Sequence, residues 1–350
     1  MSDYAVGEVY PSDQKSLAEI DTLLQAEGIR RDKNLDYICA MYDDEMNVIA
    51  TGSCFGNSLR CLAVASEYQG EGLMNAVVTH LINVQFERGN THLFLYTKYD
   101  SAKFFQSLGF YEITRIDGQI VFMENKRNGF RDYLNKLTQA SPAPDGKRVA
   151  ALVMNANPFT LGHQYLAEKA AAENDIVHLF MVSEEQSLIP YAVRKRLILA
   201  GTAHLPNLYC HDSGSYIISS ATFPSYFQPD DNAVIESNAL IDIRIFTQIA
   251  AALGIRRRYV GDEPFSRVTA IYNRIMQSRL PECGIECIVV PRKSADGHII
   301  SASGVRQAIK DNDFAAVQRM VPATTFEFFS GPEAGPIIER IRQTQNVRHY

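Results

Sequence analysis

The chain has 350 residues, of which 46% are hydrophobic and 21% charged, a composition that excludes disordered, collagenous and coiled-coil proteins. A globular chain of this length predicts two domains, since one domain commonly holds ~100 to 200 residues. The formal net charge is −6 at pH 7, so neither a nucleic-acid partner nor a membrane partner is expected. Any binding of phosphate must therefore come from a local cluster of groups and not from the net charge of the chain.

The N-terminal segment and the cysteines predict the compartment. Residues 1–14 contain Asp3 and Glu8 and have neither a basic start nor an apolar run, so no secretory signal is expected. No stretch approaches the ~18 apolar residues of a membrane span. The closest cysteine pair, Cys283 and Cys287, lacks a second pair or a histidine cluster, so no protein metal site is expected. We predict a cytoplasmic protein with reduced thiols.

The first part of the chain, residues 1–137, predicts an α+β domain. An amphipathic helix over 15–25 precedes three short strands, after which the hydrophobic period becomes helical over 72–86. A third, shorter helix is predicted over 101–108. The predicted strands are 37–41, 48–54, 59–64, 92–97, 110–115 and 119–123.

A glycine-containing turn, ASEYQGEGL, follows the third predicted strand and opens a helix. The unpaired N–H groups of a helix start can hold a pyrophosphate where Gln69, Gly70 and Gly72 let it approach, although such glycines equally suit an ordinary turn with positive φ. The pattern resembles the Gcn5-related N-acetyltransferase family, except that Met74 stands where a second small residue is usual. The segment FFQSLGF over 104–110 extends the resemblance, which implies binding of the pantetheine and pyrophosphate of coenzyme A or of a similar group.

Residues 138–147, TQASPAPDGK, predict a linker. Pro142, Pro144 and Gly146 interrupt helices and strands alike, and no apolar period survives in this segment. A second domain is therefore expected over 148–350.

The second domain alternates strictly between strands and helices. Its strands are runs of Val, Ile and Leu without polar alternation, which is typical of parallel strands buried on both faces. We predict an α/β, doubly wound, Rossmann-like parallel sheet whose ligand binds where strands end and helices begin. The predicted strands are 148–154, 176–182, 208–211 and 257–260, and the predicted helices are 163–173, 191–203 and 232–253.

The segment NANPFTLGH, residues 155–163, follows the first strand of this domain. Pro158 and Gly162 shape a tight turn, and Gly162 leaves room for a nucleotide against the backbone. On the first helical turn His163 can donate to a triphosphate oxygen, and the Thr160 hydroxyl can contact a neighbouring phosphate. The spacing resembles the T-x-G-H signature of nucleotidyltransferases, although an ordinary helix start stays open for these residues alone. The predicted ATP contacts in this segment are Asn155, Asn157, Pro158, Phe159 and Gly162.

A companion element, ISASGVR over 300–306, resembles the I-S-x-S-x-x-R element of the same superfamily. Ser303 is a candidate N-cap for a helix over 304–310, and Ser301 and Arg306 can face the β- and γ-phosphates, so Ser301 and Ser303 are further predicted ATP contacts. Alone, this string is a common capping pattern, but paired with T-x-G-H it predicts a nucleotide site. The predicted catalytic residues are His163, Thr160 and Arg306.

Three further segments border this site. Gly261 and Asp262 follow a buried strand and can hold adenine or ribose, although a turn with a capping acid fits equally. The basic run over 194–196 can meet the triphosphate, but a solvated basic face is the favoured interpretation. Residues 209–227 predict either an acyl lid or a long surface loop.

A module for pantetheine ahead of a module for ATP is an unusual pairing. With GDEPFSRVTAIYN over 261–273, it resembles the citrate lyase ligase family over nearly the whole chain. The resemblance implies a ligase that uses ATP, with Mg²⁺, to convert acetate to acetyl adenylate, releasing pyrophosphate. The acetyl group then passes to the phosphoribosyl-dephospho-coenzyme A thiol of the citrate lyase acyl carrier protein, which activates the lyase and releases AMP.

Two alternatives stay open. A cofactor adenylyltransferase, of the pantetheine-phosphate or nicotinamide mononucleotide type, uses the same T-x-G-H site but needs no N-terminal module. An N-acetyltransferase that carries a nucleotide-binding module turns over acetyl-coenzyme A without ATP.

Overall fold

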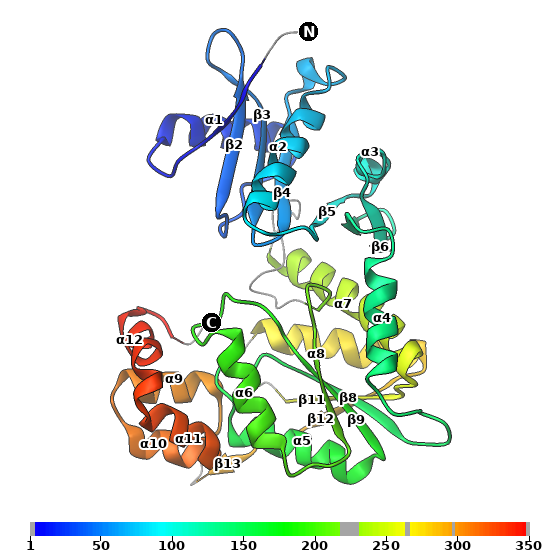
Figure 1. Ribbon diagram of the computed structural model, residues 1–350, viewed down its shortest axis with the longest axis vertical. Coiled ribbons are helices and arrows are strands. Elements are labelled where there is room, and N and C mark those ends of the chain that lie inside the picture. The colour runs from blue at the N-terminus through cyan, green and yellow to red at the C-terminus, as the bar shows by residue number, and fades with distance from the viewer. Residues whose placement is uncertain (1–3, 218–230, 263–266, 296–297, 348–350) are drawn as a thin grey trace. The chain divides into compact units, whose positions relative to one another are not determined.

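The computed structural model describes residues 4–217, 231–262, 267–295 and 298–347, and it divides them into two compact units (Figure 1). The first unit holds residues 4–132 together with 231–241, and the second holds 133–217 together with 242–347. Part of the predicted lid over 209–227 lies outside the described residues, as do residues 263–266 of the predicted segment after Asp262.

A seven-stranded sheet forms the centre of the first unit, in the order β1-β2-β3-β4-β5-β7-β6. All neighbouring strands run antiparallel except β4 and β5, which are parallel. The result confirms the predicted α+β domain. The strands are β1 (Val6–Glu8), β2 (Tyr37–Tyr42), β3 (Val48–Phe55), β4 (Ser58–Val64), β5 (Phe94–Lys98), β6 (Tyr111–Ile116) and β7 (Ile120–Glu124).

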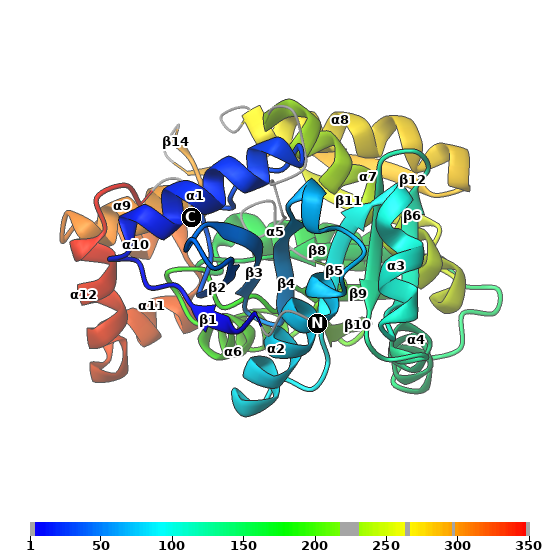
Figure 2. The same ribbon diagram turned by 90° about the horizontal axis from the view of Figure 1, so that it is seen from above.

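Two helices cover opposite faces of this sheet, as Figure 2 shows for α1 and α2. Because successive side chains of a strand point to opposite faces, Cys39 and Met41 of β2 pack in the cluster of α2, whereas Ala40 packs in that of α1. A Cβ on Gly52 of β3 would lie 2.5 Å from Val77 of α2, so this close packing requires glycine. The helices are α1 (Gln14–Ala26), α2 (Leu73–Glu87) and α3 (Ala102–Ser107), with the short turns η1 (Ser66–Tyr68) and η2 (Tyr99–Ser101).

The parallel pair β4 and β5 is joined only at its start. Ser58 lies opposite Phe94 and Leu59 opposite Leu95, and the pairing ends there. The strands diverge beyond these residues, because both continue for several residues without sharing a ladder. Among the described residues, the β4–β5 ladder therefore covers only the first part of each strand.

Helix α4 (Gly129–Gln139) is not among the predicted helices. Its start is held by Glu124, whose buried carboxylate accepts from Phe130 N at 2.7 Å and contacts His92 Nε2 at 2.6 Å. The irregular stretch before the next strand begins at Ala140, so the predicted linker overlaps the end of this helix.

Five parallel strands form the sheet of the second unit, in the order β10-β9-β8-β11-β12. This confirms the predicted doubly wound sheet, although β12 is not among the predicted strands. The strands are β8 (Val149–Met154), β9 (Ile176–Met181), β10 (Leu208–Asp212), β11 (Arg257–Gly261) and β12 (Glu286–Val290).

Helices cover both faces of this sheet, with α5 and α6 on one side (Figure 1). Ala150 and Leu152 of β8 pack there with Ala167 of α5. On the other face Arg258 of β11 pairs with Asp242 of α7 at 3.0 Å. The helices are α5 (Leu161–Glu173), α6 (Tyr191–Thr202), α7 (Asp231–Leu253) and α8 (Arg267–Arg279), followed by η3 (Pro281–Cys283).

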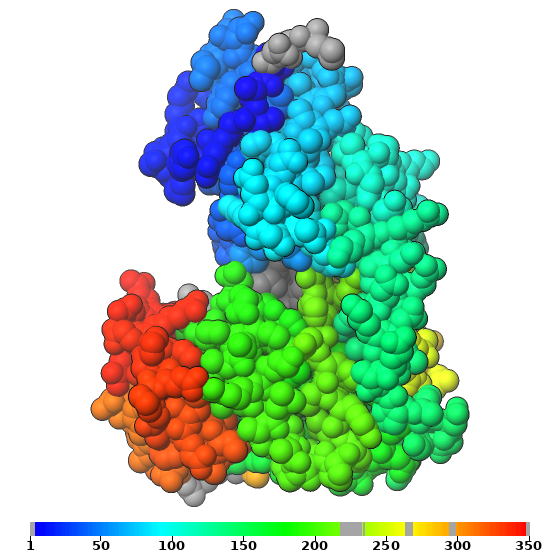
Figure 3. All heavy atoms as spheres, in the orientation of Figure 1, coloured from blue at the N-terminus to red at the C-terminus, as the bar shows by residue number. Residues whose placement is uncertain are grey.

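A small helical lobe completes the second unit, and Figure 3 shows its orange-to-red residues against the green surface of the same unit. Val305, Ile309 and Phe329 of the lobe share one core with Leu188 and Ile189, which follow β9. The elements are β13 (Ser294–Ala295), β14 (His298–Ile299), α9 (Ala302–Lys310), α10 (Phe314–Met320), α11 (Ala323–Ser330), η4 (Pro332–Ala334) and α12 (Gly335–Gln343). Among the described residues, no helix is long and apolar enough to cross a membrane.

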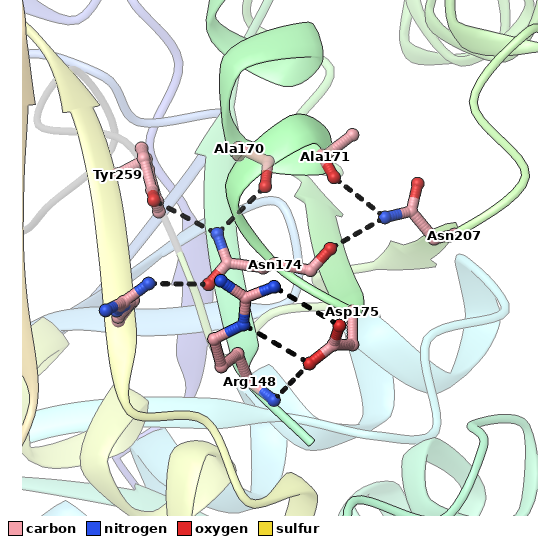
Figure 4. Close-up of polar contacts among 8 residues, drawn as sticks. Arg148, Ala170, Ala171, Asn174, Asp175, Asn207 and Tyr259 are labelled. Atoms are coloured by element: carbon pink, nitrogen blue, oxygen red, sulfur yellow. Dashed lines mark hydrogen bonds and ion pairs between the residues drawn. The ribbon is translucent and has the colours of Figure 1, made fainter.

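The C-terminal end of α5 is fixed by a polar network around Asn174 (Figure 4). The buried Asn174 amide donates to Ala170 O at 2.8 Å and to the Tyr259 hydroxyl at 3.0 Å. Asn207 donates to the Ala171 and Asn174 carbonyls, both at 2.9 Å. These bonds occupy carbonyl groups that a helix end otherwise leaves unpaired, so α5 is anchored at the end away from the predicted site.

Candidate functional site

Thr160 and His163 begin helix α5 with a reciprocal pair of hydrogen bonds. The Thr160 hydroxyl accepts from His163 N at 3.3 Å, and His163 Nδ1 accepts from Thr160 N at 3.1 Å. This is a capping box with histidine in the place usually taken by glutamate or glutamine. Thr160 is only 2% exposed and its hydroxyl lies 2.9 Å from the same Nδ1, so Thr160 is engaged with the histidine.

The surroundings of the His163 ring set both its tautomer and its protonation state. Because Nδ1 accepts the Thr160 N–H, the proton of a neutral ring is carried by Nε2. Burial, together with the positive charge of Arg292, lowers the pKa of His163 to about 4. At pH 7 the side chain is therefore a neutral imidazole with Nε2–H as its available donor.

The residues directly before Thr160 are buried and anchor the loop in the core. Phe159 is fully buried, and a Cβ on Gly201 of α6 would lie 2.3 Å from its ring. Asn157 is buried, and its Oδ1 accepts from Ile189 N at 3.2 Å. Pro158 is buried as well. Of the ATP contacts predicted in this segment, the structure leaves Asn155 and Gly162 partly exposed and buries the others.

Arg194 corrects the interpretation of the basic run over 194–196. Its side chain is fully buried and donates to Asn155 Oδ1 at 2.6 Å, as well as to several main-chain carbonyls. The carbonyls belong to Asn155, Val182, Glu184 and Ile189. A solvated face was therefore the wrong expectation for Arg194, because carbonyl groups at the ends of β8 and β9 replace water around the guanidinium. Lys195 and Arg196 are more exposed, and they pair with Asp212 and Glu333.

The ISASGVR element forms the start of α9. Ser301 is the N-cap, and its hydroxyl accepts from Gly304 N at 3.0 Å. The expected cap at Ser303 was wrong, because the helix begins two residues earlier than predicted. The Ser303 hydroxyl instead lies 3.1 Å from that of Ser301. The two serines thus present a pair of hydroxyl groups at the helix start.

Arg306 links this element to the signature loop. The side chain is 2% exposed and donates through Nε to Val347 O at 2.7 Å, while Nη1 donates to Asn157 O. Burial lowers the pKa of Arg306 to about 10, so the group stays charged at pH 7. Gly162 makes a second link, since a Cβ there would lie 3.6 Å from Ile300 O. The two predicted motifs therefore meet at the N-terminus of α5.

Gly261 is the last residue of β11, and Asp262 follows it at the same edge of the sheet. Gly261 O accepts from Asn273 Nδ2 at 2.9 Å, and Asp262 O accepts from Arg292 Nε at 2.7 Å. Arg292 comes directly after β12 and is absent from the predicted site residues. A prediction of strand 286–290 would have directed attention to it, because ligands bind at the carboxyl ends of such strands.

A cavity of about 500 Å³ lies in the first unit, between the diverging strands β4 and β5. Gln69, Gly70 and Gly72 line it, as predicted for the turn before α2. Gly72 is the N-cap of α2 with φ 84°, and no side chain caps this helix. Lys98 Nζ, also at the cavity, donates to Glu27 O at 2.9 Å. An open helix start, positive-φ glycines and the diverging strands β4 and β5 therefore border one cavity.

Comparison with known proteins shows which family the chain belongs to. A model of the citrate lyase ligase C-terminal domain matches residues 149–329, and a model of the GNAT acetyltransferase family matches residues 5–110. Citrate (pro-3S)-lyase ligase of Escherichia coli K12 is 39% identical over 343 residues, which is 96% of this chain and 95% of that protein. The chain belongs to the citrate lyase ligase family.

Two further relatives support the same family membership. The citrate (pro-3S)-lyase ligase of Haemophilus influenzae is 37% identical over 91% of this chain and 96% of its own length. That of Klebsiella pneumoniae is 37% identical over 81% of this chain and 84% of its own length. Membership in the citrate lyase ligase family confirms the resemblance seen in the sequence, with a GNAT domain at the N-terminal side, and makes this protein a ligase.

Proposed function

We propose that this protein is an AMP-forming acid–thiol ligase that activates citrate lyase. It uses ATP and acetate to acetylate the prosthetic-group thiol of the lyase's acyl carrier protein, a phosphoribosyl-dephospho-coenzyme A group. Membership in the citrate lyase ligase family supports the general role. The observation that carries the chemistry is the neutral His163 ring, held by Thr160 so that Nε2–H is its free donor at the start of α5.

The first step forms acetyl adenylate. An acetate oxygen attacks the α-phosphorus of ATP, a new P–O bond forms, and the bond from the α-phosphorus to the bridging oxygen breaks, so that pyrophosphate leaves with that electron pair. Negative charge grows on the phosphate oxygens, and His163 Nε2–H donates to one of them. A donor fixed in advance stabilises such charge without reorganisation. Mg²⁺ enters with ATP and offsets charge on its phosphates, as it commonly does through substrate oxygens.

The neighbouring residues hold this donor and the phosphates. Thr160 acts through His163, whose ring it orients. Arg306 acts through the Asn157 carbonyl and keeps the loop against α9. The hydroxyl pair of Ser301 and Ser303 donates to the remaining phosphate oxygens.

Four residues that are at least partly exposed contact the nucleotide. We assign the phosphates to Asn155 and Gly162, and the adenosine to Gly261 with Asp262 at the end of β11. Pro158 and Phe159 support this surface from the core.

The second step moves the acetyl group to the carrier thiol. The sulfur attacks the carbonyl carbon of acetyl adenylate, the C–S bond forms, the C–O bond to the phosphate breaks, and AMP leaves while the thiol proton passes to solvent. We assign the pantetheine arm to the cavity lined by Gln69, Gly70 and Gly72. The open start of α2 suits the pyrophosphate of such an arm.

Carrier acetylation tests this function directly. The purified protein is incubated with ATP, Mg²⁺, acetate and the deacetylated carrier, and the carrier mass and the nucleotides are analysed. A thioester on the carrier with equimolar AMP supports the proposal. Transfer of AMP to phosphopantetheine or nicotinamide mononucleotide, without any thioester, contradicts it in favour of a cofactor adenylyltransferase. Acetyl-coenzyme A turnover without ATP contradicts it in favour of an N-acetyltransferase.

A further inference from the structure

Lys98 is the only cation among the described residues that line the cavity of the first unit. It is the last residue of β5, and it is half-buried. Its ammonium donates to Glu27 O at 2.9 Å and makes no further hydrogen bond and no ion pair with the described residues. A lysine ammonium carries three N–H donors, so those that Glu27 does not occupy are available to a ligand in the cavity.

The direction of the strands places this charge beside the turn that opens α2. β4 and β5 are parallel, so their carboxyl ends lie at the same end of the sheet. β4 leads from there into the turn that contains Gly70 and Gly72, and β5 ends there with Lys98. All three residues line the cavity. The cation and the uncapped start of α2 therefore border one space from the ends of two neighbouring strands.

Glu27, the C-cap of α1, joins the two sides of the cavity. Its carbonyl accepts from Lys98 Nζ on the β5 side. On the β4 side its carboxylate accepts from Ser66 Oγ at 2.8 Å and from Gln69 Nε2 at 3.2 Å. A Cβ on Gly28 would lie 3.3 Å from Lys98 Nζ, so the ammonium is packed against the main chain. These contacts hold the ammonium in place and connect it through Glu27 to the turn that carries Gln69.

The charges of the cavity favour one kind of ligand. Glu27 is the one acid among the described lining residues, and both of its carboxylate oxygens are engaged with the turn. The N–H groups at the start of α2 add partial positive charge beside Lys98. The rest of the lining is uncharged and includes Leu62, Tyr96 and Phe105. A ligand with an uncharged chain and an anionic phosphate end matches this distribution.

We propose that Lys98 is a further substrate-binding residue, and that its ammonium contacts a phosphate oxygen of the prosthetic arm opposite the start of α2. This inference rests on the proposed function and adds a residue outside the glycine-containing turn to the binding site of the arm. Glu27 is a positioning residue, because its carbonyl holds the ammonium and its carboxylate holds Gln69. The fixed cation supplies a charged hydrogen bond to a phosphate that the helix start meets only with backbone donors.

Two probes that differ only by a phosphate test this contact on the full chain. Calorimetric titration with 4′-phosphopantetheine, and separately with pantetheine, compares the parent with Lys98→Met, Lys98→Arg and the control Lys15→Met. Methionine keeps an unbranched apolar stem without the charge of lysine. Lys15 is exposed in the first turn of α1 and pairs with Glu19, so its loss removes an equal charge away from the cavity.

Lys98→Met should weaken binding of phosphopantetheine by ~10-fold, as for a lost charged hydrogen bond, and should leave pantetheine binding within about twofold. Lys98→Arg should keep most of the preference for the phosphate. Lys15→Met should stay within about twofold of the parent for both probes, because exposed ion pairs contribute little. Added KCl should reduce the parent's preference for phosphopantetheine more than that of Lys98→Met, because salt screens the charge pair.

The outcomes separate the inference from the proposed function. A preference for phosphopantetheine that is lost in Lys98→Met and kept in Lys98→Arg supports the inference. An unchanged preference in Lys98→Met overturns it and leaves the proposed function standing. Equal loss of pantetheine binding in Lys98→Met also overturns it, because Lys98 then supports only the fold of the cavity. A parent that binds neither probe overturns the inference together with the assignment of the arm to this cavity, whereas carrier acetylation tests the ligase activity independently.

Discussion

Two strand-to-helix turns of this protein are both predicted to bind phosphate groups, but they are built differently. The turn from β4 to α2 ends in Gly72, has no side-chain cap and opens on a cavity. The turn from β8 to α5 is capped by Thr160, which in turn fixes His163. The first offers backbone N–H groups to a ligand, and the second offers one oriented side-chain donor.

The difference separates binding from chemistry. An open helix start can hold a pyrophosphate of any compound that fits, because backbone groups do not select the reaction. A neutral histidine of fixed tautomer is suited to a charge that appears only during the reaction. The first turn therefore suits the proposed binding of the prosthetic arm, and the second suits the proposed adenylate formation. Each of the three substitutions that follow changes one turn.

The largest effect is expected for His163→Ala. Loss of a preorganised donor should lower acetyl adenylate formation by ~100- to 10,000-fold. The measurement is acetate-dependent ATP–pyrophosphate exchange, with His204→Ala as the matched control because His204 is exposed and pairs with Glu168. A His163→Ala rate within tenfold of the parent would sink the role of this ring.

Gly72→Ala should act on the first turn. A side chain at φ 84° strains the backbone and narrows the cavity, so thioester formation at limiting carrier should fall by ~10-fold through KM. Gly118→Ala is the control, since Gly118 also has positive φ, at 69°, but lies in the turn between β6 and β7 and not at the cavity. Equal losses in the two variants would show that backbone strain alone explains the effect.

Thr160→Ala should show a smaller, double effect. Loss of the cap should cost ~1 kcal/mol in the free energy of unfolding, and a misdirected His163 ring should slow exchange by ~10-fold. Urea denaturation and exchange assays measure the two quantities. Thr160→Ser keeps the hydroxyl and should restore both, whereas a serine variant as poor as alanine would contradict the capping role.

The pH dependence should be the smallest effect on catalysis. With its pKa at about 4, His163 stays neutral from pH 8 to pH 6, so the ratio of parent to His163→Gln exchange rates should stay constant over that range. A ratio that changes with a midpoint near pH 6.5 would contradict a neutral donor.

Two other buried histidines, His178 and His211, make the free energy of unfolding depend on pH in the acid range. Burial also lowers the pKa values of His178 and His211, which contact each other at 3.0 Å, to about 3 and about 4. As the pH falls, histidines of the unfolded chain bind protons before these two rings do in the folded protein. The contribution of the two rings to the free energy of unfolding is therefore fully present above pH ~6.5 and is lost as the pH falls toward 4. Denaturation at several pH values measures this, and a flat profile would contradict buried neutral rings.

The order of elements could be predicted because both domains keep a clear hydrophobic period. Continuous apolar strands indicated the parallel sheet, and T-x-G-H with ISASGVR indicated where its ligand site lies. Strand β12, with the sequence ECIVV, was missed although four of its five residues are apolar. Helices α10, α11 and α12 were missed because their stability comes from packing in one shared core, which no local pattern reveals.

The errors at the site have similar causes. Arg194 looked like a surface residue because charged side chains are rarely buried, and only the folded chain shows the carbonyl groups that surround it. The cap was expected at Ser303 because helix ends are uncertain by one or two residues from sequence, and the structure puts it at Ser301. Arg292 belongs to no motif and becomes visible only when β11 and β12 lie side by side.

ATP–pyrophosphate exchange measures whether the turn from β8 to α5 activates a carboxylate with ATP. The parent protein is assayed with Mg²⁺ and labelled pyrophosphate, with and without acetate, first alone and then with the deacetylated carrier. We expect exchange that requires acetate and is lost in His163→Ala. No exchange at any acetate concentration, with the carrier present or absent, would contradict it.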